Sequence, residues 1–218
     1  MNQAGKPMAM QSAVYLFDPL CGWCYGATPA TRRLRDAGLV VTPVPTGLFA
    51  DHGARTMDDQ FAAYAWSNDQ KIARLSGQRF TEAYRHKVLI AGSRFDSGPA
   101  TLALTAVALE DEARELDALS LIQEARYVDG RDVASLPLVT SVLAGAGFAG
   151  AASRLQAPDP ALLSANEDRI ARGRRLMTTI GINGVPALVL SDERGTRAIA
   201  AGSLFGDLDA LLAQVKAA

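Results

Sequence analysis

Residues 18–26 read DPLCGWCYG and contain both cysteines of the 218-residue chain, Cys21 and Cys24. Two cysteines placed at random in a chain of this length would lie three positions apart only roughly once in a hundred cases. Three residues is nearly one helical turn, so both sulfur atoms are predicted on one helix face and within disulfide reach. The spacing therefore indicates a paired-thiol site.

A short apolar run at residues 14–17 precedes the pair and is typical of a β-strand, while residues 27–36 have helix-forming composition. The pair is therefore predicted to begin a helix at the end of a strand, and Pro29 should kink that helix. Unpaired amides at a helix start favour an anion, so we expect Cys21 to lose its proton more readily than a free thiol, whose pKa is about 8.5. We expect Cys21 at the surface and Cys24, deeper in the first turn, as its partner thiol.

A cysteine pair can also belong to a zinc site, a structural disulfide or an iron–sulfur cluster. A structural zinc site needs four ligands, and the chain can add only His52 and His86, which lie too far apart in sequence for ligand spacing. A purely structural disulfide would close a loop so short that it constrains little chain entropy. An iron–sulfur cluster would need thiolates from a second chain, and the sequence leaves that alternative open. We predict no metal site within the chain.

The composition is that of an ordinary globular protein. Hydrophobic residues make up 49% of the chain and the formal net charge is −1, so no general attraction to nucleic acid or an anionic membrane is expected. Residues 1–11 lack the apolar core of a secretory signal, and no later stretch is long enough to span a bilayer. We expect the chain as given to be cytoplasmic, where a cysteine pair rests reduced and suits catalysis or sensing. A signal peptide removed beforehand would leave the same sequence.

The order of predicted strands and helices divides the chain. Residues 39–45 read as a second strand, parallel to the first and confined to a sheet edge by its two prolines. Residues 51–177 show helix after helix and no convincing strand. We predict a discontinuous domain of residues 12–50 and 178–218, interrupted by a helical domain of residues 51–177. In the last part we expect strands at 181–190 and 197–201, a polar turn at 191–196 and a closing helix at 207–216.

Cap signals and periodicity predict six helices in and around the insertion. Thr56 begins a capping box for the first, which ends at Ser76. On the last one, Arg169, Arg172, Arg174 and Arg175 follow Glu167 and Asp168, which favours a solvated face over an anion site. The remaining predicted ranges are 81–90, 100–112, 116–127, 133–143 and 158–180, of which 100–112 is apolar on nearly every side and should be buried.

This order of elements resembles the thioredoxin superfamily, and the helical insertion is similar to that of its DsbA branch. More narrowly, several segments resemble the FrnE-like predicted protein-disulfide isomerases of that branch. The match extends from about Val14 to the C-terminus. The resemblance implies an α/β fold in which a thioredoxin fold is interrupted by an all-helical insertion. The matching segments are residues 15–26, 47–49, 96–97, 123–132 and 184–186.

By this resemblance, Val185 and Pro186 correspond to the cis-proline segment that packs against the two cysteines. A cis bond before proline costs little, and it would turn the Val185 backbone outward. An extended substrate could then pair there as an added strand and hold its disulfide over Cys21. Trp23 would supply an apolar surface where such a partner rests.

The sequence also departs from better-known relatives. Thioredoxin and DsbA have a buried acid for proton transfer at the position of Tyr15. Asp18 is the nearest carboxylate, and either replaces that acid or caps the helix. Gly22 and Trp23 stand where DsbA has a histidine that stabilises the thiolate, so the strongly oxidising character of DsbA does not transfer to this chain.

The cysteine pair and the distant Val-Pro predict a thiol–disulfide oxidoreductase. Cys21 would attack a substrate disulfide, and Cys24 would displace the reduced substrate from the mixed disulfide. No cofactor is predicted apart from the redox-active disulfide itself, with glutathione as a candidate reductant. The expected partners are proteins or peptides with disulfides or dithiols, not nucleic acid or membrane. The sequence leaves open the natural substrate, the direction of electron flow, the reduction potential and the oligomeric state.

Two other functions remain open. Kappa-type glutathione transferases and 2-hydroxychromene-2-carboxylate isomerases share the DsbA-like fold and bind glutathione on the cis-proline strand, but these relatives usually lack a CxxC. A non-enzymatic redox sensor would instead use oxidation of Cys21 and Cys24 to change the helix start and the partner surface.

Overall fold

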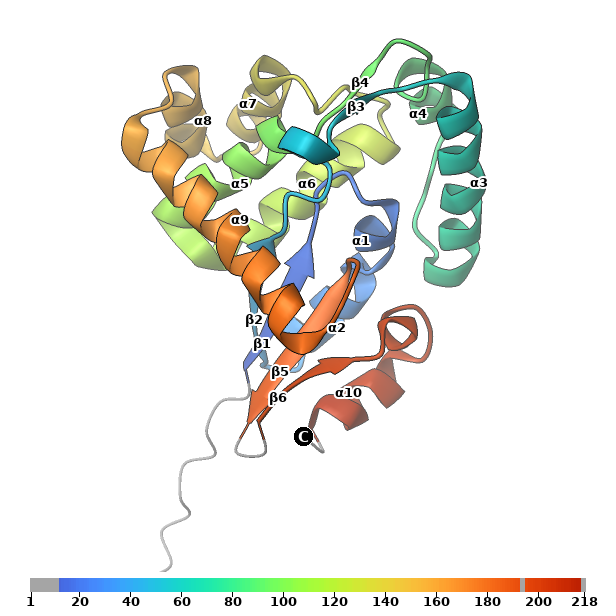
Figure 1. Cartoon of the computed structure of the whole chain (residues 1–218), viewed down its shortest axis with the longest axis vertical. Coiled ribbons are helices and arrows are strands. Elements are labelled where there is room, and N and C mark those ends of the chain that lie inside the picture. The colour runs from blue at the N-terminus through green and yellow to red at the C-terminus, as the bar shows by residue number, and fades with distance from the viewer. Residues whose placement is uncertain (1–11, 193–194, 217–218) are drawn as a thin grey trace, which may run out of the picture.

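The computed structural model describes residues 12–192 and 195–216 (Figure 1). The strands are β1 (Ser12–Phe17), β2 (Val40–Pro45), β3 (Arg55–Thr56), β4 (Arg94–Phe95), β5 (Ala187–Asp192) and β6 (Gly195–Ile199). The helices are α1 (Gly22–Gly26), α2 (Thr28–Asp36), α3 (Asp59–Ser76), α4 (Glu82–Lys87), α5 (Gly98–Asp111), α6 (Glu115–Tyr127), α7 (Leu136–Gly145), α8 (Ala149–Gln156), α9 (Pro160–Ile180) and α10 (Leu208–Lys216). Short 3₁₀ turns occur at Asp51–Gly53, Glu112–Arg114 and Ala201–Leu204.

A four-stranded mixed sheet with the order β2-β1-β5-β6 forms the centre of the fold. β1 is parallel to β2 and antiparallel to β5, and β6 is antiparallel to β5. β2 lies at the edge, as its prolines predict, because proline cannot donate a ladder hydrogen bond. Leu16 near the end of β1 pairs with Ala187 at the start of β5. The exit of β1, which leads to the cysteines, therefore lies beside the residue that follows Pro186.

Side chains of the sheet alternate between two faces, as strand geometry requires. On one face, Tyr15 of β1 belongs to the main core together with Leu34 of α2 and Leu211 of α10. On the other face, Leu16 packs in a second cluster that includes Met177 of α9. The sheet is thus covered on both faces, by α2 and α10 on one and by the C-terminal half of α9 on the other (Figure 1).

Helices α3 to α9 all come between β2 and β5 in the chain, which is the predicted helical insertion. α3 and α4 lie on one side of the molecule and α8 on the other, and α6 passes between them (Figure 1). α5 is the buried helix that its composition predicts, with Ala103, Leu104 and Val107 among its buried residues. The boundaries proposed for the two domains stay a prediction. In the part of the chain that the structure describes, no helix combines the length and apolar character needed to cross a membrane.

Several predicted elements differ from the structure. The helix expected to run through Pro29 is two helices that meet at Ala27, because Pro29 occupies the first turn of α2, where its missing N–H is harmless. The two-residue strands β3 and β4 contradict the expectation of no strand within residues 51–177, since they are too short to leave a periodic pattern. Helix α8 was not predicted and has no side-chain cap. Parts of two predictions, the segment 1–11 and the turn at 193–194, lie outside the described residues.

The predictions for the arginines of α9 and for the first residues of α3 and α9 also differ from the structure. α3 begins after the capping residue Asp58, and α9 begins after Asp159. Arg169 donates to both carboxylate oxygens of the fully buried Glu115, and Arg174 donates to backbone carbonyls after β2. The prediction of a fully solvated face is therefore wrong for these two arginines, which join α9 to α6 and to the end of β2.

Candidate active site

The two cysteines lie at the start of α1, immediately after β1. Cys21 is the N-cap residue of α1 and its side chain accepts no hydrogen bond from the first turn, while Cys24 lies within the helix. Both are free thiols. The exposed fraction is 6% for Cys21 and 1% for Cys24, so the expectation of Cys21 at the open surface is wrong. The residual exposure is nevertheless in the predicted order, with Cys24 the deeper of the two.

The segment that packs against Cys21 comes from the far end of the chain. The Cys21 thiol donates to the carbonyl oxygen of Val185 at 3.5 Å, across 164 residues of sequence. The peptide bond between Val185 and Pro186 is cis. Pairing of β5 with β1 brings this segment to the cysteines, because Ala187 follows Pro186 directly and is the partner of Leu16. The structure thus brings together Cys21, Cys24, Val185 and Pro186, as the sequence predicts.

The two thiols differ in burial and therefore in reactivity. Removal of Cys24 from water raises the pKa of its thiol well above the usual range, and a hydrogen bond with Cys21 raises this pKa further. Cys24 is therefore protonated in the resting dithiol. Cys21, the more exposed thiol, is the one placed to react first.

Two tyrosines fix the backbone on either side of the pair. The hydroxyl of Tyr15 donates to the carbonyl oxygen of Cys24 at 3.1 Å, and the hydroxyl of Tyr127 donates to that of Leu20 at 2.8 Å. Both tyrosines are buried. Tyr15 thus holds the backbone at the position where thioredoxin and DsbA have an acid. Tyr127 was not predicted as a site residue, because its only sequence signal was its place in the segment 123–132.

Asp18 is completely buried beneath the turn that precedes α1. Its carboxylate accepts hydrogen bonds from the N–H groups of Leu20 and Phe49, at 2.9 and 3.0 Å, and from the hydroxyl of Ser97 at 2.7 Å. Burial raises the pKa of Asp18, and these hydrogen bonds oppose that rise. The suggestion that Asp18 caps the helix is wrong, because its side chain joins three loops instead. Its role in proton transfer stays a prediction.

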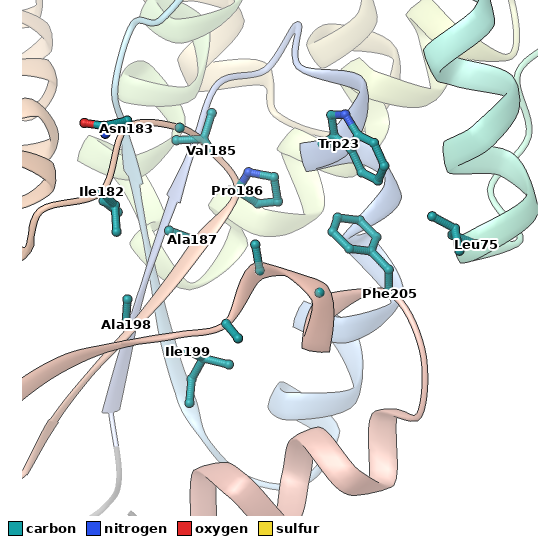
Figure 2. A pocket seen from close by; sticks show the side chains of 14 residues that line it. Trp23, Leu75, Ile182, Asn183, Val185, Pro186, Ala187, Ala198, Ile199 and Phe205 are labelled. Atoms are coloured by element: carbon teal, nitrogen blue, oxygen red, sulfur yellow. The ribbon is translucent and has the colours of Figure 1, made fainter.

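An apolar groove of about 880 Å³ adjoins the Val185 segment (Figure 2). Trp23, between the two cysteines in sequence, lies on one side of this groove with its ring edge-on to Phe205, at 5.1 Å between centroids. Ile182, Val185 and Pro186 lie on the other side (Figure 2). Phe205 was not predicted, because nothing in the sequence around it distinguishes it from a core residue. Trp23, Val185 and Pro186 thus line one groove, and their role in substrate binding stays a prediction.

Residue types that bind metals do not gather in the described part of the chain. Among residues 12–192 and 195–216, no group of three or more His, Cys, Asp or Glu side chains is arranged to hold a metal ion. His86 is exposed and pairs with Glu82, and His52 is exposed on a 3₁₀ turn.

Comparison with known proteins adds to this geometry. No protein-family model matches the chain, and no curated protein matches it in sequence. Among solved structures, the cytosolic disulfide reductase DsbM from Pseudomonas aeruginosa shares 30% identity, with a TM-score of 0.82 over 95% of this chain and 100% of DsbM. A second structure of DsbM contains glutathione and is also 30% identical, with a TM-score of 0.81. A "putative protein disulfide isomerase" from Nitrosomonas europaea shares 25% identity over 94% of this chain and 99% of its own, with a TM-score of 0.74.

The near-complete overlap with DsbM confirms the thioredoxin fold with a helical insertion. It covers 95% of this chain and all of DsbM, so the likeness is not confined to the sheet. Together with the paired thiols beside Val185 and Pro186, it shows the class of enzyme. The chain belongs to the DsbA-like thiol–disulfide oxidoreductases of the thioredoxin superfamily.

Proposed function

We propose that this enzyme exchanges disulfides through the CGWC pair, with Cys21 as the nucleophile and Cys24 as the resolving thiol. The observation that favours this assignment is the unequal placement of the two sulfurs. Cys21 contacts the carbonyl of Val185 and retains slight exposure, whereas Cys24 is sealed inside α1. Cys21 is therefore the thiol that an incoming disulfide can reach first.

The reaction balances without an added cofactor. The Cys21 thiolate attacks one sulfur of the substrate disulfide, which forms a mixed disulfide and releases the other substrate sulfur as a thiolate. Cys24 then loses its proton and attacks Cys21, which closes the Cys21–Cys24 disulfide and releases the second substrate thiol. The substrate gains two electrons and the enzyme loses two. The reverse sequence oxidises a dithiol.

The second step needs an acceptor for the Cys24 proton. Burial keeps that proton on the resting thiol, as described above. Asp18 is the carboxyl that we assign to this role, because it is buried near Cys24 and its own pKa is raised by burial. The raised pKa makes the Asp18 carboxylate a better base than an exposed one.

The substrate class follows from the groove. Trp23, Phe205 and the Val185 segment offer an apolar surface beside the reactive thiol, which suits an extended peptide with apolar residues near its cysteine. Glutathione is the small thiol that we propose as reductant, since DsbM was solved with glutathione. Two molecules would reduce the Cys21–Cys24 disulfide and leave as glutathione disulfide. We also propose a cytosolic location, in line with the description of DsbM, and membership of the FrnE-like group.

The decisive experiment measures reduction of insulin and of glutathione disulfide by the wild type, Cys21→Ser and Cys24→Ser, with dithiothreitol as the reductant that regenerates the enzyme dithiol. We expect both activities to be lost in Cys21→Ser. Cys24→Ser should capture one glutathione per chain as a stable mixed disulfide on Cys21, detected by mass spectrometry. Capture by Cys21→Ser instead would reverse the two roles, and activity that survives in Cys21→Ser would remove the assignment.

The same three proteins also distinguish the two alternative functions, a redox sensor and a glutathione-dependent transferase or isomerase. A redox sensor would be oxidised once per chain and would not increase the rate above that of a dithiol alone at low protein concentration. A glutathione transferase or chromene isomerase would keep full turnover of its substrate in Cys24→Ser. Equilibration of the pair with a glutathione redox buffer then gives the direction of exchange, because it separates reductant from oxidant.

A further inference from the structure

A second group of polar side chains lies behind the CGWC turn and belongs to the helical insertion. Asp69 of α3 is 5% exposed, and its carboxyl packs directly against Gly22. A Cβ atom at Gly22 would overlap Asp69 Oδ1 and would come within 3.2 Å of Ile72 Cδ1. The acid therefore contacts the residue that follows Cys21 in the chain.

Asp69 is held from its other side by α4 and α6. The hydroxyl of Tyr84 donates to Asp69 Oδ2 at 3.0 Å. Burial raises the pKa of Asp69 to about 7, while the Tyr84 hydrogen bond and the positive charge of Arg126 oppose the rise. Tyr84, Tyr127 and Arg126 are thus the titratable and charged groups near this carboxyl, and α1 presents Gly22 to it.

Arg126 places a full positive charge in the same region. It is 1% exposed, and its Nε and Nη1 atoms have no hydrogen-bond partner among the described residues. Its guanidinium carbon lies 5.5 Å from the ring centroid of Tyr84 and 5.7 Å from that of Tyr127. Tyr127 in turn donates to the carbonyl of Leu20, the residue before Cys21. Asp69 thus contacts the CGWC turn directly at Gly22, whereas Arg126 is connected to the turn through Tyr127.

We propose that Asp69 and Arg126 are positioning residues of opposite charge that set how readily Cys21 ionises. This inference rests on the proposed role of Cys21 as nucleophile. Ionisation of Cys21 releases one proton and leaves one negative charge at Sγ. A carboxylate at Asp69 opposes that charge, and the guanidinium of Arg126 favours it, in a region where burial weakens solvent screening. Because a stabilised thiolate stabilises the reduced dithiol, the two residues also shift the equilibrium with glutathione.

The test uses Asp69→Asn, which removes the charge but preserves the shape beside Gly22. Thiolate absorbance of the reduced protein is followed against pH. We expect the Cys21 midpoint to fall by about half to one pH unit, a roughly three- to tenfold increase in its ionisation constant. The equilibrium with glutathione should move toward the reduced dithiol by a similar factor. Arg126→Met should change both quantities in the opposite direction, and Arg126→Lys should restore them.

Asp59→Asn is the matched control, because Asp59 is an exposed carboxylate in the first turn of the same helix. It should leave the Cys21 midpoint unchanged. A folded Asp69→Asn protein with a midpoint like that of the wild type would overturn the proposal. An equal shift in Asp59→Asn would also overturn it, because the effect would then be one of net charge.

A measurement on the unmodified protein guards against failed folding of the variants. If Asp69 ionises near pH 7 and acts on Cys21, the wild-type thiolate titration should follow two coupled steps. A single step would contradict the proposal. Every protein in this test retains both cysteines. Absence of exchange activity in the wild type would therefore contradict the proposed function, and not the roles of Asp69 and Arg126.

Discussion

The hydroxyl of Ser97 donates a 2.7 Å hydrogen bond to Oδ2 of Asp18, a residue 79 positions earlier in the chain. Ser97 precedes α5 of the insertion, and Asp18 precedes the cysteines. The N–H of Phe49 donates to the same carboxylate oxygen. One buried carboxylate therefore joins the CGWC turn, the loop after β2 and the start of the buried helix.

Replacement of Asp18 by Ala should lower the free energy of unfolding by about 3 kcal/mol. The reason is that three donors, two amides and one hydroxyl, would be left without an acceptor in a buried site, at about 1 kcal/mol or more each. Urea denaturation measures this loss. Ser97→Ala is the matched comparison, because it removes one of the three bonds, and it should cost about 1 kcal/mol. An equal cost for the two variants would show that Asp18 is not the common anchor.

The contacts of Asp18 illustrate which parts of the structure this sequence predicts and which parts it does not. The segments around Asp18, Phe49 and Ser97 were all part of the family resemblance, yet the pattern gave no reason for them to meet. The parallel direction of β1 and β2, the edge position of β2 and the helical insertion follow from the order of elements, the prolines and the periodicity, which are local properties. Contacts such as Tyr127 with Leu20 depend on how α6 packs beneath the turn, and a linear pattern does not contain that geometry. The resemblance placed the Val185 segment beside Cys21, but no pattern in the sequence shows how completely the surrounding residues cover that thiol.

Replacement of Gly22 by Ala should destabilise the protein by about 1 to 3 kcal/mol. The added methyl group would overlap Asp69 Oδ1 and crowd Ile72, both of which are buried. Gly145→Ala is the control, because a Cβ there meets nothing within 4 Å and lies in helix α7. It should be neutral or slightly stabilising. Thermal or urea unfolding compares the two variants, and a Gly22→Ala protein as stable as the control would contradict the packing described here.

Replacement of Arg169 by Met should destabilise the protein by an amount that depends on pH. Burial raises the pKa of Glu115 to about 7, and the attraction of Arg169 opposes that rise. Since the folded pKa lies above the unfolded one, the folded state binds more protons, and stability falls as pH rises from about 4.5 to 7. Loss of Arg169 extends that fall to higher pH, because Glu115 would ionise without its partner. We expect a loss of about 1 kcal/mol at pH 5 and about 3 to 4 kcal/mol at pH 8.

Urea unfolding at the two pH values measures this difference. Arg172→Met, an exposed arginine on the same helix, should change stability by less than about 0.5 kcal/mol at both. An Arg169→Met protein that loses the same stability at both pH values would mean that the charge of Glu115 is not what Arg169 balances.

Replacement of Phe205 by Ala should weaken the enzyme toward peptide substrates more than toward glutathione disulfide. Phe205 packs edge-on against Trp23 and forms part of the apolar groove (Figure 2). Loss of the ring removes apolar contact worth about 1 to 1.5 kcal/mol, so kcat/KM for a disulfide peptide with apolar residues beside its cysteine should fall roughly tenfold. Reduction of glutathione disulfide, which has little apolar surface, should change by about twofold or less.

Two controls separate groove binding from a general loss of structure. Leu109→Ala removes a large apolar side chain, 48% exposed, from α5 and should leave both substrates unaffected. Phe205→Leu preserves an apolar wall and should recover most of the peptide activity. If Phe205→Ala slows both substrates equally, then the ring acts through α1, which it also contacts near Gly26, and not through the peptide. If neither substrate is slowed, the groove beside Val185 is not where peptides bind.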